Sequence, residues 1–114
     1  LEEVHTFADG IAVKSPGNLS YEMVREYVDE LVTVSDDEIA AAILTLMEKQ
    51  KIVSEGAGAV SVAAVLFNKL PLKGKKVVCI ISGGNIDVNI LSVSCFPFLL
   101  YFNWIWCHRI LDTV

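Results

Sequence analysis

An apolar run that ends in a glycine-rich turn constrains the fold of this chain more than any other feature of its sequence. Residues 77–81 (VVCII) are continuously apolar, and the residues 82–85 (SGGN) follow directly. A strand covered on both faces in a parallel sheet has this composition. Such a strand, ending in a small-residue turn that opens a helix, is where open α/β sheets bind ligands. The run therefore predicts a central parallel strand, and the turn is either a ligand-binding turn or a plain strand-to-helix connection.

The remaining pattern alternates short β-branched stretches with helical ones. We expect strands at 11–13, 32–34 and 76–81, and helices at 21–31, from 36 to about 51, at 60–68, and from about Asp87 onward. Ser20 is a suitable N-cap for the first helix. This order predicts an α/β fold, with part of a parallel open sheet and flanking helices.

The helix expected from residue 36 carries the clearest local signals. Ser35 and Glu38 have the spacing of a capping box, in which each side chain bonds the backbone N–H of the other residue. The buried stripe of this helix is predicted to contain Ile39, Ile43, Leu46 and Met47.

The composition is unusually apolar, since 54% of the residues are hydrophobic. Either the chain associates with a membrane, or it is a piece of a larger protein whose apolar faces expect partners. The apolar run from Cys95 to Cys107 is shorter than the roughly 20 residues that a bilayer span requires. We therefore expect no membrane span, and we interpret residues 93–114 as a tail that does not fit the rest of the chain.

Charge and cysteine content exclude other classes. The net charge is −5, with 9 basic and 14 acidic residues, so nucleic-acid binding is not expected. The three cysteines (Cys79, Cys95 and Cys107) match no zinc or CxxC spacing, and their odd number argues against a secreted disulfide framework. No signal peptide is expected at the N-terminus. These features predict a cytoplasmic setting.

Three segments, in this order, resemble the fold-type II enzymes that depend on pyridoxal 5'-phosphate (PLP). They are ThrPheAlaAspGly at 6–10, SerGluGlyAlaGlyAla at 54–59, and the stretch from Val77 to Asp87. Residues 28–43 are similar to the connecting region of the same family. The resemblance is strongest to the threonine dehydratase (threonine ammonia-lyase) branch and covers residues 1–92. It implies the C-terminal part of a catalytic domain with an incomplete, tryptophan synthase β-like fold.

The resemblance also implies a set of site residues. The residues implied to bind the cofactor are Gly10, Glu55, Ser82, Gly83, Gly84 and Asn85, and Asp9 is implied to lie on the substrate side. Ser82 would hydrogen-bond the pyridine nitrogen of PLP, and a neutral hydroxyl makes the ring a weaker electron sink than a carboxylate would. The structural alternatives are a helix N-cap for Ser82, an Asx turn for Asp9, and a helix-start carboxylate for Glu55. No metal site is expected.

The implied activity belongs to a longer parent protein. The resemblance implies that the parent is a lyase that converts L-threonine to 2-oxobutanoate and ammonia, with L-serine as a further candidate substrate. It also implies a cytoplasmic, homo-oligomeric enzyme of amino-acid metabolism that acts in isoleucine biosynthesis. None of the lysines in the chain lies in the family's Ser-x-Lys-type motif, so the isolated chain is expected to be inactive. The alternatives are the serine dehydratase or serine racemase branch of the same family, and a non-catalytic α/β interaction module.

Overall fold

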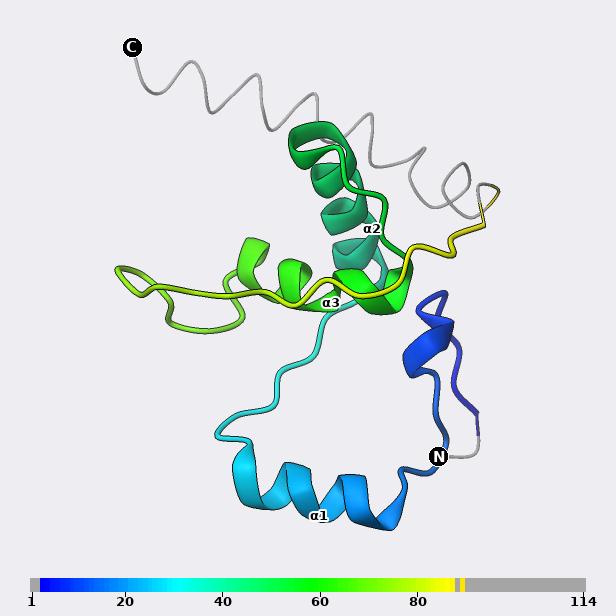
Figure 1. The fold of residues 1–114 in the computed structure, drawn as a ribbon, viewed down its shortest axis with the longest axis vertical. Helices are drawn as coiled ribbons and strands as arrows, with labels where there is room; N and C mark the ends of the chain where they lie inside the picture. Colours follow the sequence, from blue (N-terminus) through cyan, green and yellow to red (C-terminus); the bar gives the residue numbers. More distant parts are fainter. Residues whose placement is uncertain (1–2, 88, 90–114) are drawn as a thin grey trace.

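Three helices and two short helical turns form the described part of the chain. The structure, a computed structural model, describes residues 3–87 and 89. The elements are η1 (Asp9–Ile11), α1 (Asn18–Tyr27), α2 (Asp36–Thr45), η2 (Leu46–Gln50) and α3 (Gly56–Leu66). The helix α2 continues into the π-helical turn η2 and packs against α3, and η1 packs against α3 (Figure 1). Among the described residues, α1 packs against no other helix or helical turn.

The start of α2 confirms the predicted capping box. The backbone N–H of Ser35 donates to Glu38 Oε2 at 2.8 Å, and the backbone N–H of Glu38 donates to Ser35 Oγ at 3.3 Å. Both bonds satisfy N–H groups that the first helical turn leaves without partners. The predicted stripe is also confirmed, because Ile39, Ile43 and Leu46 are buried and Met47 is packed against the core.

An ion pair joins the start of α2 to the stretch after α3. Lys69 Nζ lies 2.7 Å from Glu38 Oε1. The Lys69 ammonium, which bonds the carboxylate, and then the Ser35 N–H lower the pKa of Glu38. Because the folded-state pKa is lowered, the added stability is present above the unfolded-state pKa of about 4.3. It is lost as the pH falls through the folded-state value.

We expect Glu38→Gln to lower the free energy of unfolding by roughly 1 kcal/mol at about pH 7. Glutamine can still accept the Ser35 N–H bond, so the substitution removes the charge and keeps the cap. The difference from wild type should be smaller at about pH 3 than at about pH 7 in urea unfolding followed by circular dichroism, because it is lost as the pH falls through the folded-state pKa of Glu38. Lys69→Gln should show the same pH dependence. A loss that is equally large at both pH values would show that the ion pair is not its source.

The core between α2 and α3 consists mainly of alanine. Its buried residues are Ala8, Ile39, Ala42, Ile43, Leu46, Ala59 and Ala63. Helix axes approach more closely where the side chains at the contact are small, so the alanines bring α3 close to α2. Alanine contributes little apolar area, which leaves the two isoleucines and Leu46 as the large buried side chains of this contact.

Two helices begin earlier than predicted. The helix α1 starts at Asn18 with Gly17 as its N-cap, so Ser20 lies inside the first turn and the prediction of a Ser20 cap was wrong. Glycine is accepted at this position, although it supplies no side-chain bond. The helix α3 starts at Gly56, four positions before the predicted Val60. Its first turn is glycine-rich, and local propensity alone disfavours a helix there.

None of the predicted strands forms a ladder within the part of the chain that the structure describes. Residues 11–13 were predicted as a strand, but Ile11 belongs to the turn η1. The backbone N–H of Ile11 donates to Ala8 O at 3.0 Å. Residues 76–81 run as an extended chain beside α3 (Figure 1). Val78 is 91% exposed and Ile80 78% exposed there, whereas a central strand would be covered. The parallel sheet therefore stays a prediction.

The end of the chain contributes little to the described structure. The predicted tail, residues 93–114, lies outside the described residues, as does nearly all of the helix expected from Asp87. Within residues 3–87 and 89, no helix has both the length and the apolar character needed to cross a bilayer.

Candidate functional site

The turn after the extended segment meets the start of α3 at Glu55. The backbone N–H of Glu55, the N-cap residue of α3, donates to Gly83 O at 3.3 Å. Gly83 has a φ of +71°, and a Cβ at this position would overlap the Glu55 carboxylate. Only glycine combines this backbone conformation with such a close neighbour. The Glu55 carboxylate can therefore lie against residue 83 only because that residue is glycine.

The turn η1 brings the N-terminal segment to the same carboxylate. A Cβ on Gly10 would lie 3.3 Å from Glu55 Oε1. The Thr6 hydroxyl holds this segment against α2, because it donates to Asp36 Oδ1 and accepts from the Ala8 backbone N–H at 3.1 Å. The three segments that resemble the PLP enzymes thus converge on Glu55.

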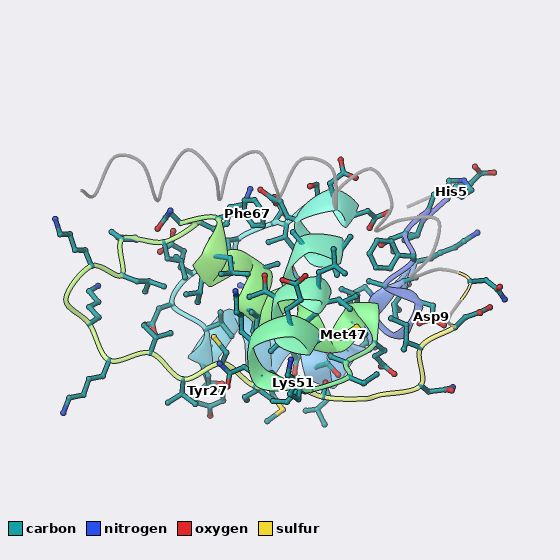
Figure 2. The ribbon with its side chains drawn as sticks, turned by 90° about the horizontal axis from the view of Figure 1, so that it is seen from above. His5, Asp9, Tyr27, Met47, Lys51 and Phe67 are labelled. Carbon is teal, nitrogen blue, oxygen red and sulfur yellow. The ribbon has the colours of Figure 1, made fainter. Side chains whose placement is uncertain are left out.

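A half-open hollow of about 240 Å³ lies at this junction. Its lining residues are Phe7, Asp9, Glu55, Gly56, Asn85, Ile86 and Asp87. Gly56, the first residue of α3, lines the hollow, and Figure 2 shows Asp9 well away from Phe67, the C-cap of that helix. Three carboxylate side chains face one small volume, so the hollow favours cations and neutral polar groups and disfavours anions.

The predicted site residues divide into three groups. Asp9, Glu55 and Asn85 line the hollow, and Gly10 and Gly83 border the Glu55 carboxylate. Ser82 and Gly84 are exposed and do not line the hollow. The Ser82 carbonyl oxygen faces α3, where a Cβ on Gly58 would overlap it.

The residues present fit one end of PLP and not the other. The exposed Ser82 can offer a neutral hydroxyl to a ring nitrogen, and the exposed turn 82–85 leaves its backbone open to a flat ring. The carboxylates of Asp9, Glu55 and Asp87 would repel the doubly charged phosphate. These residues therefore suit the ring end, and the phosphate would have to lie away from this hollow.

Sequence reasoning missed several residues that build the site. Thr6 and Asp36 hold η1, Gly58 lets the Ser82 backbone approach, and Ser61 donates to Ile80 O at 2.7 Å. A single hydroxyl in the middle of an apolar helix follows no pattern, although the Ser61 position on the same helix face as Gly58 was a usable signal. No metal-binding cluster occurs among the described residues.

The chain belongs to the family described as pyridoxal-phosphate dependent enzymes, whose model matches residues 1–83. It is 66% identical over 87 residues to the L-threonine ammonia-lyase of Thermotoga maritima, covering 76% of this chain and 21% of that protein. It is 52% identical over 89 residues to the catabolic L-threonine dehydratase of Escherichia coli, covering 76% of this chain and 27% of that protein.

A solved structure has the same fold. The serine racemase of Dictyostelium discoideum superposes with a TM-score of 0.67 at 36% identity, over 75% of this chain and 28% of that one. The chain thus spans between a fifth and a third of the length of these relatives. The predicted family and branch are confirmed, and the activity of the whole protein is a separate proposal.

Proposed function

We propose that this chain is the C-terminal part of the catalytic domain of a PLP-dependent L-threonine ammonia-lyase, called the parent protein below. Its activity would be the conversion of L-threonine to 2-oxobutanoate and ammonia. The observation that carries the proposal is the convergence of Gly10 and Gly83 on the Glu55 carboxylate beside an exposed Ser82. The 66% identity to a threonine ammonia-lyase supports the substrate.

The residues of this chain would form the wall that faces the cofactor ring. The Ser82 hydroxyl would donate to the ring nitrogen, and it would not hold a proton there as a carboxylate does. When bound, the cofactor supplies an electron sink for loss of the α-proton and the β-hydroxyl. Asp9 and Glu55 would lie on the acidic side of the hollow, where a substrate ammonium group is attracted and a phosphate is not.

The remaining features of the parent also belong to the proposal. A cytoplasmic location and a homo-oligomeric assembly are part of the proposal for a member of this family. A parallel sheet that covers residues 76–81 would bury the apolar side chains that are exposed on this segment. A role in isoleucine biosynthesis and a catabolic role share the same reaction, and catabolic dehydratases are among the relatives.

A second candidate, racemisation or dehydration of serine, has support from the superposition on a serine racemase. Both candidates share the ring wall formed by this chain. They differ in which amino acid the purified parent protein consumes faster. Competition between L-threonine and L-serine, with 2-oxobutanoate, pyruvate and D-serine measured separately, therefore distinguishes them.

We expect the purified parent protein to release ammonia and 2-oxobutanoate from L-threonine, and the 114-residue chain alone to release neither at a rate above buffer. The physical reason is that no lysine in the chain lies in the motif that would form the Schiff base. A coupled assay for 2-oxobutanoate, with PLP added to both samples, checks this. If the isolated chain releases product, the expectation that the reacting lysine lies outside this chain is wrong. If the parent protein consumes neither L-threonine nor L-serine, the proposed function is wrong.

A further inference from the structure

Four contacts join α3 and its N-cap residue Glu55 to residues 79–83. Glu55 N donates to Gly83 O at 3.3 Å, and Ser61 Oγ donates to Ile80 O at 2.7 Å. The Cys79 thiol donates to Ser61 O at 3.7 Å. Between these contacts, Gly58 lies against the Ser82 carbonyl oxygen. The extended segment therefore runs antiparallel to α3, as Figure 1 also shows.

The distance between the Glu55 and Ser61 contacts is about the same along the helix as along the extended segment. From residue 55 to residue 61, a helix rises about 9 Å. From residue 80 to residue 83, an extended chain covers about 10 Å. Because the two lengths agree, the bond at Ser61 and the bond at Glu55 can form at the same time.

A change of register would move the Ser82 hydroxyl. Successive side chains of an extended chain point to opposite sides, so a shift by one residue would place Ile81 or Gly83 where Ser82 now lies. Gly58 allows the correct register, since any larger residue would push the Ser82 backbone away from α3. The Ser61 side chain holds the other end of this segment, because its hydroxyl donates to Ile80 O.

We propose that Ser61 is a positioning residue: with Gly58 it fixes the register of residues 80–83 on α3 and so presents the Ser82 hydroxyl to the cofactor ring. This inference rests on the proposed function only for the identity of the ring. The register itself is a property of the contacts among Glu55, Ser61 and the segment 80–83. Ser61 acts through Ser82 and touches neither cofactor nor substrate.

The first test uses the cofactor-free parent protein and needs no activity. Ser61→Ala removes the bond to Ile80 O, so the hydrogen bond from the Glu55 amide to Gly83 O should open more often. Hydrogen exchange at the Glu55 amide should become roughly two- to twelvefold faster, the range set by one hydrogen bond. Ser61→Thr keeps a hydroxyl and should restore the wild-type rate. The Ile43 amide, inside α2, reports any global loss of stability.

The second test uses the parent protein loaded with PLP labelled with ¹⁵N at the ring nitrogen. The ring resonance should shift in Ser61→Ala in the same direction as in Ser82→Ala, and return in Ser61→Thr. Ser20→Ala, the same change on the exposed helix α1, should leave it unchanged. Wild-type Glu55 exchange and ring resonance in Ser61→Ala would overturn the inference. A Ser82→Ala variant with an unshifted resonance would instead refute the ring contact of the proposed function.

Discussion

Gly83→Ala should weaken PLP binding by the parent protein about 5- to 30-fold, measured by fluorescence titration. A left-handed backbone costs a residue with a side chain about 1–2 kcal/mol. At Gly83, a Cβ would also overlap the Glu55 carboxylate, so the turn and the carboxylate cannot both keep their positions. The expected weakening follows if the turn relaxes out of its binding conformation by this amount of free energy.

Gly74→Ala is the matched control for this substitution. Gly74 has a φ of +77°, close to that of Gly83, but no heavy atom of the described residues other than its chain neighbours lies within 4 Å of the position its Cβ would take. We expect Gly74→Ala to lower stability through the same backbone cost and to leave PLP affinity unchanged. Equal losses of PLP affinity in the two variants would contradict the special role of the Gly83–Glu55 contact.

Ile43→Ala should lower the free energy of unfolding of the parent protein by about 2–5 kcal/mol. Ile43 is 2% exposed and lies in the core between α2 and α3, where the neighbouring alanines cannot extend to fill a cavity. Ile43→Val provides the graded control and should cost about 0.5–1.5 kcal/mol. Urea unfolding followed by circular dichroism measures both. Similar losses for the two variants would show that the core collapses around the smaller side chain.

Local signals account for what could be predicted of the helices. The capping box and the stripe of Ile39 and Ile43 act within α2 itself, so both were predicted correctly. The start of α3 was not, because its glycines disfavour a helix locally. Gly56 packs against Phe7 and Gly58 against the Ser82 carbonyl oxygen, so contacts far apart in the sequence fix that helix start.

The site followed a similar division. Residues 82–85 were singled out by their residue types and by family resemblance, but their contact with Glu55 was not predicted, since no spacing rule joins distant segments. The hydroxyls of Thr6 and Ser61 were missed because single polar side chains carry no periodic signal. The strands could not be confirmed because a strand is defined by its ladder partners, and none lies among residues 3–87 and 89.

The register contacts between α3 and the segment 80–83 have a consequence for the order of assembly. They join residues 55–61 to residues 79–83 within one continuous stretch of the chain, and the entropy of closing a loop rises only slowly with its length. We therefore expect this stretch to reach its folded arrangement as soon as residues 55–83 are complete, without waiting for contacts with other parts of the proposed parent protein.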